Sequence, residues 1–329
     1  MSHSNISLFV PHIGCGGQCT FCNQRHITGH SKAPNGDDVR NAVLTALNSD
    51  AFDSKDGEIA FFGGSFTAID RSYMLELLSS AKAFVDDGSV SGIRISTRPD
   101  CIDVDVLNIL KEYGVTAIEL GAQSMRDSVL KNNKRGHTAQ DVVNASRLIK
   151  EFGFKLGLQM MTGLYTSSFE DDLYTAEQII ALSPDTVRIY PTITIKNTEL
   201  ESLFRAGTYK PQNLNDAAEQ CALLLDLFDK KNIKVIRLGL HTVSEEAYVA
   251  GPWHPAFREL CESIRFRNKV LPFLKDGSSY EISVSPKYLS KALGQKKSNI
   301  SYFNNKNIFV RITSDNSLTD DKFIVKEVK

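Results

Sequence analysis

The sequence predicts an α/β fold: a partial (β/α)6 TIM-like barrel followed by a small C-terminal α+β domain. Short apolar runs alternate with amphipathic stretches over roughly the first three quarters of the chain, which is typical of repeated βα units. The connections are short and the repeat is nearly regular, so a curved partial barrel is favoured over a flat, doubly wound sheet. Two prolines and a glycine in Gly251–Pro255 interrupt the pattern and predict a boundary, with domains at 1–248 and 249–329.

The barrel strands are expected at short apolar runs bounded by turn-forming residues. They are Ile6–Val10, Glu58–Phe62, Ile93–Ser96, Ala117–Gly121, Lys155–Met160 and Thr186–Tyr190. Amphipathic helices are expected between them. In one of these helices the apolar residues at helical spacing, which we expect on a single buried face, are Val39, Val43, Leu44 and Leu47. Barrels of this kind build their sites from the loops that follow the carboxyl ends of the strands.

The C-terminal domain is expected to be small and basic. Its predicted strands are Tyr280–Val284, Asn307–Ile312 and Phe323–Val325. A helix is expected to begin at Ser285-Pro286 and to end at Gly294. From Tyr248 onward the chain has 14 Lys+Arg and 8 Asp+Glu, against 24 and 31 in the preceding part. Lysines such as Lys296 and Lys297 are read first as a solvated helix end, with a nucleic-acid contact as the alternative.

Bulk composition narrows the functional classes. The chain has 329 residues, is 42% hydrophobic and has a formal net charge of -1, so its total charge provides no general attraction to nucleic acid or to a membrane. No signal peptide is recognised, and no apolar stretch is long enough to cross a membrane. A cytoplasmic protein is therefore expected.

Three cysteines carry the strongest chemical signal. Cys15, Cys19 and Cys22 have C-x3-C-x2-C spacing directly after the first predicted strand. Thiolates this close together can wrap one soft-metal centre, and three ligands to a 4Fe-4S cluster leave one iron open for another ligand. A zinc site completed by His12 or His26 is the structural alternative. The remaining cysteines are read as small buried hydrophobes; they are Cys101, Cys221 and Cys261.

With Phe21 before its last cysteine, this motif resembles the signature of radical S-adenosylmethionine enzymes. The resemblance implies a 4Fe-4S cluster whose open iron chelates S-adenosyl-L-methionine. It also implies that one electron from the cluster cleaves this cofactor to a 5′-deoxyadenosyl radical, which abstracts hydrogen from a substrate. A reductant such as flavodoxin or ferredoxin is expected as a partner.

Further candidate residues follow the other strands. Gly63 and Gly64 either make a tight turn or let backbone carbonyls approach the methionine amino group of the cofactor. Arg98 is suited to a carboxylate and Gln123 to ribose hydroxyls, although both could be ordinary loop polar groups. On the last barrel strand, Arg188 and Tyr190 are expected to face the barrel interior and to contact the substrate, with Gln159 on the strand before. Thr138 with Asp141 reads as a helix N-cap.

Taken in order along the chain, these motifs resemble the radical domain of the Elongator catalytic subunit and, more distantly, oxygen-independent coproporphyrinogen oxidases. The matching stretches begin at Pro11, Phe21, Gly63, Ser96, Glu119, Arg135 and Arg188. The Elongator subunit also carries an acetyltransferase domain, whereas only about eighty residues follow the barrel here. The substrate is therefore left open. The alternatives are modification of tRNA wobble uridine with a separate acyl donor, and a non-catalytic iron-sulfur or zinc protein.

Overall fold

The chain divides into two compact units, which are described separately. A computed structural model describes residues 5–10, 19–23, 33–50, 52–240 and 243–328. The first unit comprises residues 1–212 and 228–251, and the second comprises 213–227 and 252–329. The helix that spans Leu214–Lys230 contributes to both. The domains expected from the sequence, 1–248 and 249–329, stay a prediction.

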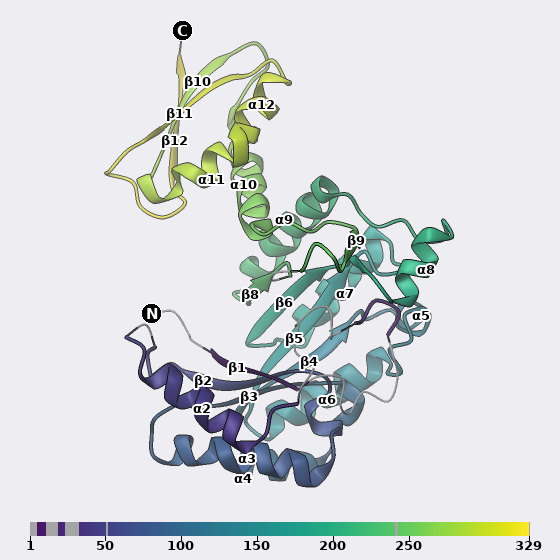
Figure 1. Ribbon diagram of the computed structural model, residues 1–329. Helices are drawn as coiled ribbons and strands as arrows, with labels where there is room; N and C mark the ends of the chain where they lie inside the picture. Colours follow the sequence, from purple (N-terminus) through teal and green to yellow (C-terminus); the bar gives the residue numbers. More distant parts are fainter. Residues whose placement is uncertain (1–4, 11–18, 24–32, 51, 241–242, 329) are drawn as a thin grey trace. The chain divides into compact units, whose positions relative to one another are not determined.

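The first unit is built on seven parallel strands curled into a half-barrel (Figure 1). In sheet order they are β1 (Asn5–Val10), β2 (Glu58–Gly63), β3 (Gly92–Thr97), β4 (Val115–Gln123), β5 (Lys155–Thr162), β6 (Thr186–Pro191) and β8 (Lys234–Leu238). Every neighbouring pair in this order is parallel. The predicted partial barrel is confirmed, and β8 extends it by a strand that the sequence analysis did not predict.

Helices connect these strands, as a parallel sheet requires. They are α2 (Gly36–Leu47), α3 (Arg71–Asp86), α4 (Val104–Glu112), α5 (Asp127–Asn132), α6 (Ala139–Glu151), α7 (Phe169–Ala181), α8 (Glu199–Arg205) and α9 (Leu214–Lys230). Short 3-10 turns η1 (Phe66–Ala68) and η2 (Pro99–Cys101) follow β2 and β3, and β7 (Thr194–Ile195) pairs antiparallel with β9 (Tyr248–Ala250). The predicted cap of α6 is confirmed, because Thr138 and Asp141 form a capping box.

One expectation about α2 is wrong. Val39 and Val43 are fully buried, but Leu44 is 51% exposed and Leu47 is 36% exposed. A helix of radius about 2.3 Å with 3.6 residues per turn presents only part of its circumference to a sheet. Residues that flank the buried stripe can therefore share the helical spacing and still face solvent.

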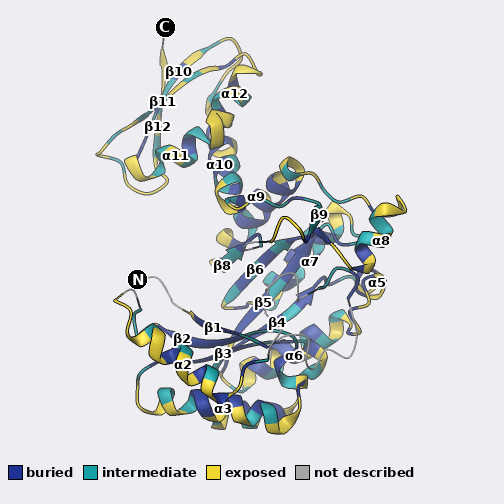
Figure 2. Cartoon of the chain, in the orientation of Figure 1, coloured by how far each residue is buried: buried dark blue, intermediate teal, exposed yellow. Residues whose placement is uncertain are grey.

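The two faces of the half-barrel differ in composition. Side chains alternate between the two faces along each strand. On one face they are apolar and buried, and they include Ile59, Phe61, Ile93, Ile95, Ile118, Leu120, Val187 and Ile189. The alternate residues include the buried Glu58, Arg94 and Glu119 and the half-buried Gln159, Arg188 and Tyr190. Helices α2, α3, α4, α6 and α7 contact the strands and cover the apolar face (Figure 2). These helices therefore lie on one face of the sheet, and the alternate, more polar set of side chains points to the other, open face.

The second unit has its own hydrophobic core. Helices α10 (Phe257–Val270), α11 (Leu289–Leu293) and α12 (Ser298–Asn304) accompany strands β10 (Ser279–Val284), β11 (Phe309–Ser314) and β12 (Phe323–Val328). The central strand β10 pairs parallel with β11 and antiparallel with β12. Phe266, Ile282 and Phe303 are among the residues buried in this core. The three predicted strands and the helix end at Gly294, which has a positive φ of 72°, are confirmed.

Within the described part of the chain, none of the helices combines the length and the apolar character that crossing a membrane would need.

Candidate active site at the carboxyl ends of the strands

The described part of the cysteine motif, Cys19 to Asn23, is anchored to the body of the first unit. The Thr20 hydroxyl donates to Asn133 Oδ1 at 2.9 Å, and the Leu200 amide donates to the Thr20 carbonyl at 2.8 Å. Cys19 is buried, Cys22 is half-buried, and the Cys22 amide donates to the Cys19 carbonyl at 3.1 Å. Cys15 and the histidines His12 and His26 lie outside the described residues. The structure therefore fixes where two of the three predicted ligands lie.

Asn133 holds this loop in place. Its side chain is fully buried at the end of α5, and its Nδ2 donates to the carbonyls of Val129 at 2.8 Å and Tyr165 at 2.9 Å. Phe21 of the loop packs on the apolar cluster formed by Val129, Met161 and Leu164. Polar and apolar contacts thus set the position of the cysteines relative to α5 and the carboxyl end of β5.

A buried arginine touches the cysteine motif. Arg135 donates from Nη1 to Cys19 Sγ at 3.1 Å and from Nη2 to the Gly121 carbonyl at 2.7 Å. Only 7% of Arg135 is exposed. Arg135 begins one of the matching motifs in the sequence, but the motif alone indicates no role for it. Its contact with Cys19 depends on the tertiary structure, because the two residues are 116 positions apart.

The glycine pair after β2 brings two strand ends close together. Gly63 has a φ of 118°, and a Cβ at this position would lie 2.6 Å from the Val10 carbonyl oxygen at the end of β1. The Gly64 amide donates to the same oxygen at 2.9 Å. A side chain at position 63 would be strained and would clash with backbone. The glycines therefore allow a close backbone approach between the ends of β1 and β2.

Hydroxyl groups tie the loop after β2 to the loop after β3. Thr97 Oγ1 lies 2.8 Å from Ser65 Oγ and 2.6 Å from Thr67 Oγ1, and the Arg98 amide donates to Ser65 Oγ at 3.2 Å. The Arg98 guanidinium forms a two-point pair with Asp100. Although burial acts in the opposite direction, this pairing keeps the pKa of Asp100 below its usual value. Arg98 is thus positioned at the rim of the half-barrel with its charge partly compensated.

Gln123 lies at an irregular end of β4. The register between β4 and β5 shifts between Gly121 and Gln123, and Gln123 has a φ of 65°. This bulge turns the side chain so that its Oε1 accepts a hydrogen bond from Gln159 Nε2 at 3.1 Å. The predicted residues Gln123 and Gln159 therefore lie together on the open face.

His137 lies beside this strand end and is buried. Its Nε2 lies 3.2 Å from the Ala122 carbonyl, so Nε2 must carry the proton in this contact. Burial, with the positive charge of Arg135 as a second cause, lowers the pKa of His137 to about 4. The imidazole is therefore neutral near pH 7.

A row of alternating charges crosses the open face. Arg94 pairs with Glu58 at 2.6 Å and with Glu119 at 3.3 Å, and Glu119 pairs with Arg188, whose Nε and Nη2 each lie 2.8 Å from one of its oxygens. The Arg188 guanidinium also lies 4.8 Å from the centre of the Phe62 ring. Burial alone would lower the pKa of Arg188, but Glu119 and Tyr190 raise this pKa above its ordinary value. The alternation expected for Arg188 and Tyr190 on β6 is confirmed.

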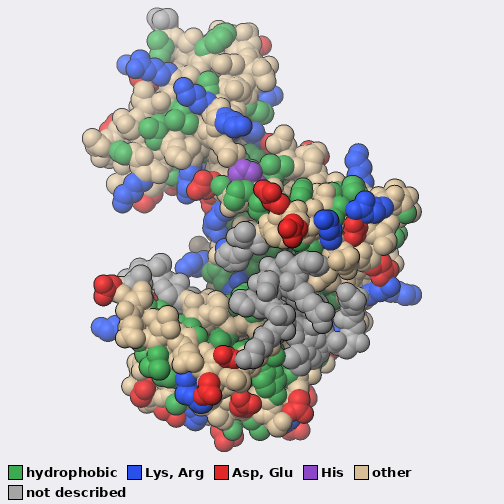
Figure 3. Space-filling model, in the orientation of Figure 1, with side chains coloured by type: hydrophobic (Ala, Val, Ile, Leu, Met, Phe, Trp, Pro, Cys, Tyr) green, Lys and Arg blue, Asp and Glu red, His purple; other side chains and the backbone are tan. Residues whose placement is uncertain are grey.

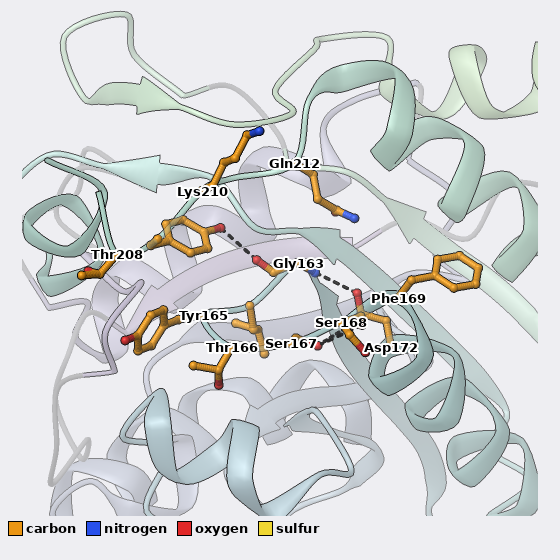
Figure 4. Close-up of a pocket in the computed structure, with 12 residues that line it drawn as sticks. Gly163, Tyr165, Thr166, Ser167, Ser168, Phe169, Asp172, Thr208, Lys210 and Gln212 are labelled. Carbon is orange, nitrogen blue, oxygen red and sulfur yellow. Dashed lines mark hydrogen bonds between the residues drawn. The ribbon is translucent and has the colours of Figure 1, made fainter. Parts of the chain in front are cut away.

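A separate pocket of about 280 Å³ opens beyond β5 (Figure 4). It lies between the loop from Gly163 to Ser168 and the segment from Thr208 to Gln212. Tyr209 donates to the Gly163 carbonyl at 2.8 Å, and Asp172 accepts from the Gly163 amide at 2.9 Å and from Ser167 at 2.6 Å. None of the site residues predicted from the sequence lines this pocket.

Comparison with known protein families decides the class. The model described as "Radical SAM superfamily" matches residues 9–179, just over half of the chain, and the model described as "Radical_SAM C-terminal domain" matches residues 184–265. The chain belongs to the radical SAM superfamily. The predicted class is confirmed, and this radical SAM chain is an enzyme of that superfamily.

Several curated relatives of this radical SAM chain are known. It is 37% identical over 128 residues to the tRNA uridine(34) acetyltransferase of Methanocaldococcus infernus, which covers 38% of this chain and 24% of that protein. It is 35% identical over 139 residues to human Elongator complex protein 3, covering 41% of this chain and 25% of that protein. The chain thus spans about a quarter of the length of these relatives. The predicted relationship to the Elongator subunit is confirmed.

A shorter relative matches along most of its length. An uncharacterized protein of Methanocaldococcus jannaschii is 28% identical over 282 residues, which is 82% of this chain and 83% of that protein. Among solved structures, Methanocaldococcus infernus Elp3 with an N-terminal deletion superposes with a TM-score of 0.67 at 22% identity, covering 81% of this chain and 63% of the other. That likeness supports the radical SAM half-barrel fold.

Proposed function

We propose that this radical SAM chain uses a 4Fe-4S cluster and S-adenosyl-L-methionine to abstract hydrogen from a substrate bound at the open face of the half-barrel. The family implies both cofactors. The observation that carries the proposal is the anchored loop of Cys19 and Cys22, in which the Cys19 sulfur contacts Arg135 and Arg135 in turn donates to the Gly121 carbonyl of β4.

The residues present fit these cofactors. Thiols in C-x3-C-x2-C spacing are the donor set of a cluster with an open iron, and Cys15, Cys19 and Cys22 would hold it. When bound, the two cofactors supply a 5′-deoxyadenosyl radical. The half-buried backbone at Gly63 and Gly64, which carries no side chain, suits an amino group.

Two side chains would complete the S-adenosyl-L-methionine site. Arg98 suits the carboxylate, because a guanidinium at the rim can exchange its pair with Asp100 for a ligand. Gln123, linked to Gln159, suits the ribose hydroxyls. Arg188 and Tyr190, both on β6, would contact the substrate.

The decisive experiment is an assay for 5′-deoxyadenosine. The protein is reconstituted anaerobically with iron and sulfide, reduced with dithionite and incubated with S-adenosyl-L-methionine. We expect 5′-deoxyadenosine from the wild type and none from Cys19→Ala. A fully assembled cluster without any cleavage would overturn the proposal and favour the non-catalytic alternative. Zinc in place of iron would favour the zinc alternative with His12 or His26.

A second candidate is modification of tRNA at the wobble uridine with an acyl donor carried by another protein. The similarity to tRNA uridine(34) acetyltransferases favours it. The second unit also exposes Lys287, Lys296, Lys297 and Lys306, and Figure 3 shows Lys and Arg side chains over the visible face of this unit. Neutralising phosphates with these lysines would make binding depend steeply on salt.

Binding of purified tRNA at several salt concentrations tests this candidate. We expect the logarithm of the affinity to fall linearly with the logarithm of the salt concentration. Replacing the four exposed lysines with glutamine should flatten that slope. Tight binding that ignores salt, or no binding at all, would contradict it. Flavodoxin and ferredoxin are proposed as electron donors, and each can be tested by replacing dithionite in the cleavage assay.

A further inference from the structure

Arg135 is exceptional among the buried arginines of the described residues. Arg94, Arg265 and Arg267 are also less than a tenth exposed, and each forms an ion pair with a carboxylate. Arg135 has no such pair within the part of the chain that the structure describes. Its side-chain hydrogen-bond acceptors in that part are the Gly121 carbonyl and Cys19 Sγ, and its Nε has none there.

An uncompensated buried cation is costly. A guanidinium stays protonated at any physiological pH, so it cannot escape burial by losing its charge. Removing such a charge from water is strongly unfavourable unless an anion compensates it. Among the described residues, the group in contact with Arg135 that becomes anionic on binding a metal is the Cys19 thiol. The Arg135 guanidinium therefore already lies beside the sulfur that becomes negatively charged on binding a metal.

The surroundings fix the guanidinium in this position. A Cβ on Gly121 would lie 3.2 Å from Arg135 Nη2, so the glycine leaves room for the approach. Asn133 anchors the preceding residues, and the capping box at Thr138 anchors the following helix. The neighbouring His137 is neutral and does not compete for an anion. Arg135 is therefore pre-organised towards Cys19 rather than towards solvent.

We propose that Arg135 is a positioning residue of the cluster: it donates a hydrogen bond to the Cys19 sulfur and raises the cluster's reduction potential. The inference rests on the proposed function, because it requires that Cys19 ligate a cluster. Adding an electron makes the cluster more negative, and a nearby fixed cation stabilises that state. A higher potential makes the cluster easier to reduce by a cellular electron donor.

A redox titration of the reconstituted cluster, followed by electron paramagnetic resonance, tests the proposal. At the wild-type midpoint potential, we expect Arg135→Gln to show about a tenfold lower ratio of reduced to oxidised cluster. For a one-electron couple this equals a shift of about 59 mV to lower potential. Arg135→Lys keeps the charge and should restore most of the ratio. Arg147→Gln removes one charge from an exposed position on α6 and should leave the ratio unchanged.

Other outcomes separate the possible failures. An unchanged potential in Arg135→Gln would overturn the role of Arg135, and so would an equal shift in Arg147→Gln. If Arg135→Gln assembles no cluster but Arg135→Lys assembles one with a near-wild-type potential, charge compensation is supported. If both variants fold, as judged by circular dichroism, yet neither holds a cluster, charge compensation is overturned. A wild type that assembles no cluster would instead refute the proposed function.

Discussion

Cys19 combines two features that rarely occur together in a structural cysteine. It is buried, yet its sulfur accepts a hydrogen bond from a guanidinium. The guanidinium and the sulfur are therefore already in contact at the position where the proposed cluster would be bound.

Cys19→Ala should abolish cluster assembly and leave the half-barrel folded. The loop that carries Cys19 follows β1, and the core beneath the sheet is made by other residues. Iron and sulfide content measured with circular dichroism checks both parts. Cys261→Ala, in α10 of the second unit, is the control and should keep its iron. Unfolding of Cys19→Ala would mean that the metal is structural.

His137 should give the protein a component of acid sensitivity. Its folded pKa of about 4 lies below the ordinary value of 6.5, so between these pH values the unfolded chain binds a proton that the folded chain does not. The free energy of unfolding should therefore fall as the pH drops from 6.5 to 4, by roughly 3 kcal/mol from this group. Above pH 6.5 the group contributes no pH dependence.

Chemical denaturation at several pH values measures this effect. His137→Gln keeps an N–H donor for the Ala122 carbonyl but does not titrate. Its loss of stability between pH 6.5 and 4 should be shallower than that of the wild type. Parallel curves for the two proteins would show that the histidine is not kept neutral in the folded state.

At the scale of elements, the ends of strands β1 and β2 lie against each other. Gly63 ends β2 with a φ of 118° and lies against the Val10 carbonyl at the end of β1. The cysteine motif starts five residues after Val10. A change at the end of β2 therefore acts directly on the strand that leads into the cysteine loop.

Gly63→Ala should destabilise the protein by about 2–4 kcal/mol, because both backbone strain and a clash with Val10 oppose the new methyl group. Gly88→Ala is the matched control: Gly88 also has a positive φ, of 77°, but a Cβ there meets nothing within 4 Å. It should cost about 1 kcal/mol, from strain alone. Thermal and denaturant unfolding of both variants measures the difference. Equal losses would mean that the close approach of β1 and β2 imposes no constraint.

At the scale of the whole molecule, the charged row ties together strands that are distant in the sequence. Glu58, Arg94, Glu119 and Arg188 come from β2, β3, β4 and β6. Each charge is compensated by its neighbours in the row. Glu119 is central, since it pairs with both arginines.

Glu119→Gln should destabilise the fold by about 3–5 kcal/mol, because it removes the carboxylate that pairs with the largely buried Arg188 and leaves Arg94 with Glu58 alone. The exposed pair between Arg147 and Glu151 provides the control. Glu151→Gln should cost less than about 1 kcal/mol, since water screens that pair. Denaturant unfolding compares the two. A small loss in Glu119→Gln would mean that water reaches the open face and solvates the charges.

The local features of this protein could be predicted from the sequence. Six strands of the half-barrel, the three strands of the second unit and the cap at Thr138 depend on apolar runs and turn residues that lie close together in the chain. Strand β8 was missed because Lys234 and Arg237 interrupt its apolar run. The exposure of Leu44 and Leu47 was misjudged because the width of a buried helical stripe depends on the packing partner.

The sequence by itself determined the class of chemistry, because three thiols within eight residues can meet one metal centre whatever the rest of the chain does. Only the tertiary structure decided which distant groups serve that centre. Arg135 reaches Cys19 across 116 positions, and Asn133 reaches Thr20 across 113. The fold likewise brings together Cys221 and Cys261, which have no paired spacing. Such contacts depend on the order and curvature of the strands, and no local pattern encodes them.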